Sequence, residues 1–529
     1  MHKEIFKRLV APIQKAIERK ERKRFEEKLK TIQEISDHSA SERVLIDAGW
    51  DNPNYWLRYS ILHAALNWSP KHLMGYLGPF RRKEQLGTLS YFGIERWGDL
   101  MKERPSFQAN IKLAEHYCAT FKRQSDIIEA KLPSELPGVL LYDYILKKQR
   151  AAYVDLGDVS VKHHVLFFLN AITSANEVLA AEKPDLVVSS HAISWFSALL
   201  WVALQKKIPV IVPFGDNGVL RFWRIDHPGH LYDFADRLKF HEALSLSKEK
   251  REALAVVGES VLRKRFSGSS NNLGALFAYG NRRKSVDRAA ICDQYRWDHQ
   301  KKIVGVYASN WFDFPHGAGM KHFENFYDWI SQTLEKMAVN KTVNWLLKAH
   351  PCDEWYGGLT LEDMVNVDRY DHIRLASKHW NGLDMIKSLD AFITYHGTIG
   401  IEAAALKKPV MVADQGWYED WGFVKRPASR EDYLELLGTQ WWSEMDGEKN
   451  ATLARIFSGV YWGIPLWQKE WLLGDDSEQW RIYQTAPNLI DNNRHVITQE
   501  IEMVRKWYAS RRPHYHAYKM IHSDSYLCS

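Results

Sequence analysis

The chain has 529 residues, of which 45% are hydrophobic and 26% are charged, the composition of a globular protein long enough for two domains. Its four cysteines form no CxxC pair, so neither a disulfide framework nor a structural zinc site is expected, and a reducing compartment fits. The net charge of +6 suits an anionic substrate or membrane face, and no Lys/Arg block with interleaved aromatics indicates nucleic acid. No run of about eighteen apolar residues and no signal-peptide core is present, so we expect a cytoplasmic protein.

Residues 1–35 are predicted to form one long basic helix. Phe6, Val10, Ile13 and Ile17 recur at helical spacing, and Lys and Arg are dense at the other positions. Two interpretations stay open. The helix packs on the body of the protein, or it lies as an amphipathic helix on the anionic face of the inner membrane.

The next part of the chain changes character near residue 138. Residues 40–135 are mixed and mostly helical, without recognisable chemistry, and a strand is expected at 138–142. Strands predicted at 184–190 and 208–213 then alternate with helices at 165–181 and 192–205. Continuous Val/Ile runs of this kind are typical of a parallel sheet covered on both faces.

A second series follows a polar, helical connector at 240–300. Strands are predicted at 302–308, 343–348, 390–395 and 409–413, helices at 323–337 and 398–406, and a helical, Trp-rich tail from about 430. The two series predict an α/β fold of the GT-B type. It comprises two Rossmann-like doubly wound domains with a cleft between them, an N-terminal helix and a helical C-terminal tail.

Ligands of such sheets bind at the carboxyl ends of the strands, which makes polar residues just after a strand candidates for a site. The rule selects Ser189-Ser190-His191, Gly215-Asp216-Asn217, Ser309-Asn310, His350 and His396-Gly397-Thr398.

The motif His396-Gly397-Thr398-Ile399-Gly400-Ile401-Glu402 leads from a predicted strand into a helix. Gly397 and Gly400 let backbone amides approach a ligand, and the helix dipole favours phosphate. A simple helix cap formed by Thr398 is the alternative.

Lys348-Ala349-His350-Pro351 ends the preceding predicted strand with a cation and an imidazole. The imidazole can donate a hydrogen bond to a phosphate oxygen, although a core histidine bonded to backbone is the alternative. Because both motifs follow consecutive predicted strands, together they favour a nucleotide donor bound in one crevice.

Asp216 follows a strand and could deprotonate an acceptor hydroxyl or act as a nucleophile. It could also form an Asx-turn, and Asp226 and His191 are alternative catalytic groups. Arg221 is placed to hold a carboxylate bidentately. Asp313, His316 and Asp353 match no dedicated ligand spacing, so we expect no metal.

The C-terminal half resembles the bacterial capsule-polysaccharide biosynthesis family, which includes the β-Kdo transferases of capsule and O-antigen assembly. Four stretches carry the resemblance: 311–316 with 326–329; 343–351; 396–403; and 408–413 leading to Gly416-Trp417-Tyr418. It implies a GT-B glycosyltransferase that uses a CMP-activated acidic sugar, such as Kdo from CMP-Kdo, without a metal or another cofactor.

The resemblance also implies roles for particular residues. His350-Pro351 would contact the donor's nucleotide and phosphate, as the similar motif does in bacterial sialyltransferases. The family's acidic-acidic-Gly-Phe-Leu-Arg stretch is matched in part by 215–221, where Asp216 takes the first acidic place and Asn217 stands at the second. The full expected set is Asp216 and His191 for catalysis; Lys348, His350, Pro351, His396, Gly397, Thr398, Gly400, Glu402, Ser309 and Asn310 for the donor; and Arg221, Asn217 and Tyr418 for the substrate.

The expected organisation follows from these motifs. Residues 1–40 form the basic helix, 41–295 the acceptor-side domain, 296–430 the nucleotide-sugar-binding domain, and 431–529 the helical extension. The partners would be a nucleotide-sugar donor, a glycan or glycolipid acceptor of capsule, O-antigen or lipopolysaccharide synthesis, and the membrane through 1–35. Three other classes stay open: a CDP-polyol phosphotransferase of the teichoic-acid type, a non-hydrolysing sugar-nucleotide epimerase, and a non-enzymatic membrane scaffold.

Overall fold

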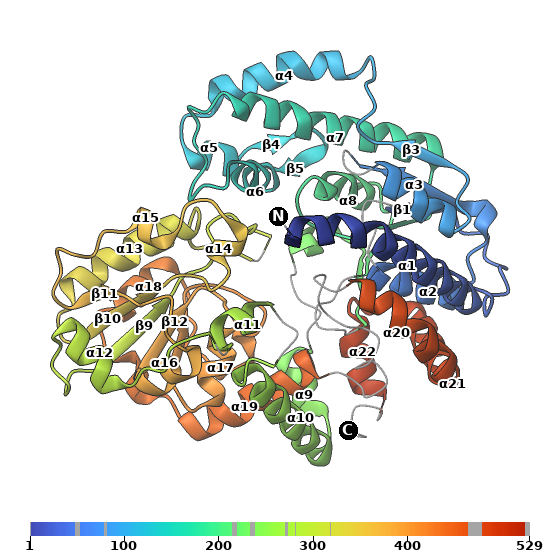
Figure 1. Ribbon diagram of the computed structural model, residues 1–529. Helices are drawn as coiled ribbons and strands as arrows, with labels where there is room; N and C mark the ends of the chain where they lie inside the picture. Colours follow the sequence, from blue (N-terminus) through green and yellow to red (C-terminus); the bar gives the residue numbers. More distant parts are fainter. Residues whose placement is uncertain are drawn as a thin grey trace.

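The computed structural model describes residues 2–47, 53–78, 82–213, 220–232, 238–269, 273–280, 282–317, 319–463 and 479–523. In this part of the chain two sheets, one parallel throughout and one parallel except for an edge strand, are each covered by helices on both faces (Figure 1). The predicted α/β fold of the GT-B type is therefore confirmed. We call each sheet with its covering helices a unit.

The first sheet has the order β3-β2-β1-β6-β7-β8, and only β8 runs antiparallel to its neighbour. Its strands are β1 (Val44–Asp47), β2 (Leu73–Leu77), β3 (Trp97–Asp99), β6 (Leu186–Val188), β7 (Val210–Val212) and β8 (Trp223–Ile225). The prediction found β6 and β7 but missed β1, β2, β3 and β8. Periodicity cannot separate apolar runs this short from turns of a buried helix.

Successive residues of β1 face two different hydrophobic cores, as the pleat of a strand requires. Leu45 packs in the core that includes Phe168 and Leu200, whereas Val44 and Ile46 pack in the core that includes Trp56 and Trp507. The helices of this unit are α1 (His2–Gln33), α2 (Pro53–Leu66), α3 (Arg82–Tyr91), α4 (Phe107–Thr120), α5 (Gln124–Ile128), α6 (Gly138–Gln149), α7 (Ser160–Glu182) and α8 (Phe196–Gln205). The small hairpin of β4 (Lys131–Leu132) and β5 (Leu136–Pro137) precedes α6.

The strand predicted at 138–142 is wrong, because these residues begin helix α6. All but one of the residues from Gly138 to Leu146 are buried, so the apolar run has no polar face to reveal its helical period. A side chain at Gly138 would clash with the carbonyl oxygen of Ile127 at 1.8 Å, so only glycine lets the helix start this close to α5.

The second sheet has the order β11-β10-β9-β12-β13 and is parallel throughout. Its strands are β9 (Ile303–Tyr307), β10 (Asn344–Lys348), β11 (Ile373–Leu375), β12 (Ala391–Thr394) and β13 (Val410–Val412). All were predicted except β11, whose three residues include a charged Arg374. Helices of this part are α9 (Phe240–Ser245), α10 (Lys248–Phe266), α11 (Leu273–Tyr279), α12 (Arg288–Tyr295), α13 (Phe326–Val339), α14 (Asp353–Tyr356), α15 (Leu361–Met364), α16 (Gly382–Ser388), α17 (Ile399–Ala405), α18 (Arg430–Leu436) and α19 (Gly447–Trp462).

The predicted C-terminal helices are present, and they divide between the two units. Helix α19 packs on α10 and α17 of the second unit. Helices α20 (Gln479–Asn492), α21 (Arg494–Ser510) and α22 (Tyr515–His522) return to the first unit, where α20 lies along α1 and α21 along α2 (Figure 1).

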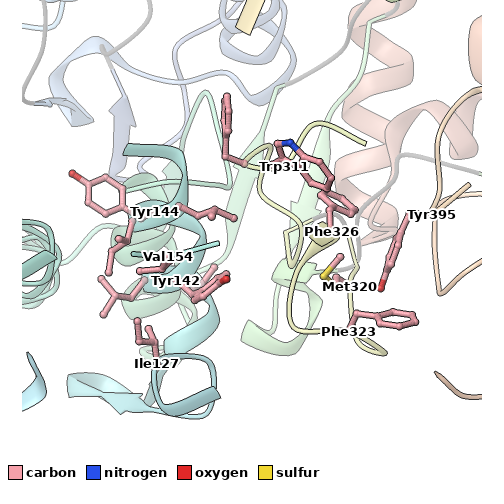
Figure 2. Packing of buried hydrophobic residues seen from close by; sticks show 14 of the residues in the cluster. Ile127, Tyr142, Tyr144, Val154, Trp311, Met320, Phe323, Phe326 and Tyr395 are labelled. Carbon is pink, nitrogen blue, oxygen red and sulfur yellow. The ribbon is translucent and has the colours of Figure 1, made fainter. Parts of the chain in front are cut away.

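The two units meet through α6 and the loop that follows β9. Figure 2 shows this contact, with Tyr142 and Tyr144 of α6 on one side and Trp311 and Phe326 on the other, all in one buried cluster. Buried polar contacts join the same elements, such as the bond from Asn325 Nδ2 to the Tyr142 hydroxyl at 2.9 Å. The loop after β9 is thereby held against α6 of the first unit.

One helix within the described residues, α7, is long and apolar enough to cross a membrane by length and composition alone. Half of its most apolar window is buried, and it packs against α4, α6 and α8 in the core of the first unit. A core helix meets the same length and composition criteria.

Candidate functional site

Both sheets reverse their strand order beside their first strand, between β1 and β6 and between β9 and β12. In doubly wound sheets ligands bind at the carboxyl ends near such a reversal. The residues that follow β6, β9, β10 and β12 occupy these positions, and they include most of the predicted site.

A cavity of about 490 Å³ opens at the carboxyl ends of β10 and β11. The predicted residues Lys348, His350 and Pro351 line it together. Its volume lies within the range of small-molecule sites. Four further lining groups were missed by sequence reasoning: Arg283, Ser377, Lys378 and His379. Residues 377–379 follow the unpredicted strand β11, and Arg283 comes from the polar connector, so no local motif marked them.

His350 presents a hydrogen-bond donor to this cavity. Its Nδ1 accepts the backbone N–H of Cys352 at 3.3 Å, which leaves the ring proton of a neutral imidazole on Nε2. Burial lowers the pKa of His350 to about 4, against a smaller opposing effect of Asp313, so the ring is neutral at physiological pH. The side chain is still 33% exposed, which leaves it accessible to a ligand.

Lys348 is a buried cation at the end of β10, with 8% of its surface exposed. Burial lowers its pKa to about 8, assisted by the nearby Arg283 and opposed by Glu362. The ammonium is therefore present at neutral pH but poorly solvated, which favours an anionic ligand.

Asp353 lines the same cavity, and Asn310 contacts Asp353. Asn310 Nδ2 donates to Asp353 Oδ1 at 3.1 Å, and burial raises the pKa of Asp353 to about 6. Ser309, at the end of β9, is half-buried. Asn310 thus reaches the cavity through its contact with a residue that lines it.

The turn at 396–400 follows β12, which lies two strands along the sheet from β10, with β9 between them. The expectation that the two motifs follow consecutive strands is therefore wrong: β11 intervenes in the chain and β9 in the sheet. Asp313 connects them electrostatically, since its carboxylate raises the pKa of both His350 and His396 against the larger effect of burial. Burial lowers the pKa of His396 to about 4.

Aromatic side chains support this turn from behind. Trp417 Nε1 donates to the His396 carbonyl at 2.9 Å, and the Tyr418 hydroxyl donates to the Gly397 carbonyl at 2.7 Å. A Cβ at Gly400 would lie 2.2 Å from that hydroxyl, so glycine is needed for the contact. Thr398 is exposed and makes no side-chain cap bond, so the simple-cap alternative is not what the structure shows.

Glu402 lies in a buried ionic cluster on the far side of α17. Its Oε1 accepts from Arg265 Nε at 2.9 Å and Nη2 at 2.8 Å, and Oε2 accepts from the Tyr279 hydroxyl at 2.5 Å. Arg265 also stacks on Trp462 at 4.1 Å. With 4% of its side chain exposed, Glu402 holds α17 in place rather than presenting a carboxylate to a ligand.

The catalytic and substrate-binding residues predicted in the first unit differ in their burial and in their hydrogen-bond partners. Asp216 and Asn217 lie outside the described residues. Arg221 is 3% exposed, stacks on Tyr461 at 4.3 Å and donates to its carbonyl. Asp226 accepts two bonds of 3.0 Å from Arg224 Nε. His191, at the end of β6, lies at the reversal point of the first sheet.

The three residues considered for a metal have separate partners. Asp313 bonds Lys147 and Tyr356, His316 bonds Asp143, and Asp353 bonds Asn310. Among the residues described here, no group of three or more His, Cys, Asp or Glu side chains is placed to hold a metal ion.

No protein-family model matches the chain, and no curated protein sequence matches it. Among solved structures, it is similar to the β-Kdo 2,4-transferase KpsC of Thermosulfurimonas dismutans, with 14% identity over 52% of this chain and 78% of that one, and a TM-score of 0.32. The UDP-GlcNAc 2-epimerase of Neisseria meningitidis matches at 14% identity over 79% and 96% of the chains, with a TM-score of 0.23. The corresponding enzyme of Rickettsia bellii matches at 14% over 85% and 98%, with a TM-score of 0.28. Likenesses this distant assign no activity.

Proposed function

We propose that the chain is a glycosyltransferase that takes a sugar from a nucleotide-activated donor. The observation that carries the proposal is the cavity at the ends of β10 and β11, where a buried ammonium, an Nε2–H imidazole and a guanidinium meet. Cationic and N–H donors converging in a partly desolvated site are what a phosphate ligand requires.

The charges of the cavity favour a nucleotide over an uncharged sugar. Arg283, Lys348 and Lys378 are cationic lining residues, against the two carboxyl groups of Asp353 and Glu362. Burial raises the pKa of Asp353, which reduces its negative charge near the lower end of the physiological range. In transfer, the same cations would stabilise the charge that develops on the departing nucleotide phosphate.

The proposal extends to the identity of the transferred sugar and of its acceptor. The resemblance in 300–425 favours a CMP-activated acidic sugar such as Kdo, passed to a glycan or glycolipid of the bacterial surface. A cytoplasmic enzyme at the inner membrane fits these substrates. Phe25, Leu29 and Ile32 of α1 are buried, and Lys28 pairs with Asp491 of α20 at 2.6 Å, so a membrane contact would use the exposed basic side chains of α1.

The test is stabilisation by nucleotides. We expect CMP to raise the melting temperature of the protein more than UDP, GDP or CDP-glycerol does, because a ligand bound only by the folded state stabilises it. Lys348→Met and His350→Ala should each weaken CMP binding about 10- to 100-fold, the loss of one hydrogen bond to a charged group.

Two exposed residues provide matched controls. Lys341→Gln and His299→Gln remove the same kinds of side chain from the surface of the second unit and should leave the shift unchanged. Stabilisation by none of the four nucleotides would overturn the proposal, and selective stabilisation by CDP-glycerol would favour a phosphotransferase.

A further inference from the structure

A hydrogen-bonded chain of three side chains lies at the reversal point of the first sheet. Strands β1 and β6 are parallel neighbours, with Ile46 paired to Val188. Asp47 is the last residue of β1, and Ser190 and His191 follow β6 directly, so the three meet at the carboxyl edge. This is the ligand-binding position of a doubly wound sheet.

The hydrogen bonds link Asp47 to Ser190, and Ser190 to His191. Asp47 Oδ2 accepts the backbone N–H of Ser190 at 3.1 Å and also bonds the Ser190 hydroxyl. Ser190 Oγ in turn lies 2.9 Å from His191 Nδ1. Asp47 and Ser190 are each only 1% exposed, so water does not compete for these bonds.

The number of available protons fixes the tautomer of His191. Asp47 Oδ2 accepts the Ser190 amide, which marks it as the acceptor for the hydroxyl proton as well. The hydroxyl of Ser190 has one proton and gives it to Asp47, so its oxygen accepts from His191 Nδ1–H. In the neutral ring this leaves the lone pair on Nε2.

Two aromatic rings fix the plane of this imidazole. Tyr55 stacks on His191 with centroids 5.9 Å apart, and Phe196 stacks on it at 5.3 Å. Burial lowers the pKa of His191 to about 4, so the ring is unprotonated at neutral pH. The carboxylate of Asp47 offsets this weak basicity during reaction, because it stabilises the imidazolium that forms.

The segment that carries His191 contacts the other unit. A Cβ built on Gly317, in the loop after β9, would lie 3.1 Å from Cγ2 of Ile193. His191 is half-buried, two residues before that contact. It is therefore placed at the junction between the sheet that holds the donor cavity and the sheet that faces it.

We propose that Asp47 and Ser190 are positioning residues that hold His191 as the Nδ1–H tautomer, with Nε2 as the base that deprotonates the acceptor hydroxyl. This inference rests on the proposed glycosyl transfer. The acceptor O–H bond breaks and its proton passes to Nε2, while the oxygen forms a bond to the anomeric carbon. The bond from that carbon to the phosphate breaks, and its electron pair leaves with the nucleotide. The imidazolium then releases its proton to water.

The tautomer is tested without any substrate. In protein labelled with ¹⁵N-histidine, long-range ¹H–¹⁵N correlation identifies the protonated ring nitrogen, and His191→Gln assigns the signal. We expect Nδ1–H in the wild type and loss of that preference in Ser190→Ala. An Nε2–H ring in the wild type would overturn the proposal.

The role in transfer is tested by kinetics. Hydrolysis of CMP-Kdo and of UDP-GlcNAc, with water as acceptor, should fall about 10²- to 10⁴-fold in kcat in His191→Gln and at least about 10-fold in Ser190→Ala and Asp47→Asn, with KM unchanged. Ser197→Ala, a nearby buried serine that donates to the Ser194 carbonyl, should behave as wild type.

The two proposals fail in distinguishable ways. Unchanged kcat in Ser190→Ala, in protein whose nucleotide-induced melting shift is intact, would overturn the relay and leave the proposed function standing. Absence of a melting shift with every nucleotide would instead count against the proposed function. The NMR measurement of the His191 tautomer would still test the hydrogen bonds from Asp47 through Ser190 to His191.

Discussion

Two histidines at the ends of strands differ in what their Nε2 atoms can do. His350 accepts a backbone N–H at Nδ1, so Nε2 is a donor suited to phosphate. In the proposed relay His191 donates from Nδ1 to Ser190, which makes Nε2 an acceptor suited to a proton. The sequence could place both residues at strand ends. It could not assign the tautomer of His191, because Asp47 lies 143 residues from the serine that it bonds.

The pH dependence of nucleotide binding is predicted from Lys348. Its pKa is lowered to about 8, so the free protein loses the ammonium as the pH rises through 8. A bound phosphate restores the proton, so affinity for CMP should decline steadily from pH 8 toward the ordinary lysine value. Titration calorimetry between pH 7 and about 10 measures this decline.

The pH dependence of folding stability that arises from Lys348 should have the opposite sign to that of CMP affinity. Between pH 8 and 10.5 the unfolded chain binds a proton at Lys348 that the folded protein does not, so its contribution to the unfolding free energy rises with pH. Lys348→Met should remove both pH effects. A Kd for CMP that stays constant through this range in the wild type would contradict the assignment.

At the scale of elements, continuous apolar runs with a polar turn predicted strands well. The run at 303–307 and the run at 344–348 were located because each is buried on both faces and followed by a turn. The first two turns of helix α6 were mistaken for a strand for the same reason: they are almost entirely buried. The cavity was predicted only on its β10 side. Its other wall follows β11, a strand too short to show a pattern.

Helix α17 depends on an ion pair whose partners are distant in sequence. Glu402→Gln would leave Arg265 buried without its counterion, and we expect a loss of about 3–5 kcal/mol in unfolding free energy. Urea denaturation measures the loss, and a weaker nucleotide-induced melting shift should accompany it because α17 carries the turn at 396–400.

The exposed pair of Lys407 and Glu448 gives a matched comparison on the same unit. Glu448 is 77% exposed, so Glu448→Gln should cost less than about 1 kcal/mol. Equal losses in the two variants would show that Glu402 does not hold α17 through its buried charge.

At the scale of the whole molecule, the proposed donor cavity and the proposed base belong to different units. All residues that line the cavity fall within 277–380. The relay is built from β1 and β6 of the other sheet. The units share one hydrophobic cluster through α6 and the loop after β9, so the junction sets the distance between donor and base.

A buried carboxylate secures that junction. Asp143 on α6 accepts the backbone N–H groups of His316 at 3.1 Å and of Gly317 at 3.0 Å, and its other oxygen lies 2.7 Å from His316 Nδ1. Asp143→Ala would leave these buried donors without their acceptor, at a cost of about 3 kcal/mol in unfolding free energy.

Because Asp143 lies at the junction and not in the cavity, its substitution should affect transfer and leave nucleotide binding intact. We expect Asp143→Ala to keep the CMP-induced melting shift, because the cavity lies within one unit, while donor hydrolysis falls at least about 10-fold since small misplacements of reacting groups are costly. Lys147→Gln removes the neighbouring, partly exposed pair with Asp313 and should have little effect on either measurement. If Asp143→Ala abolished the melting shift as well, the cavity would depend on the junction, and donor binding could not be ascribed to the second unit alone.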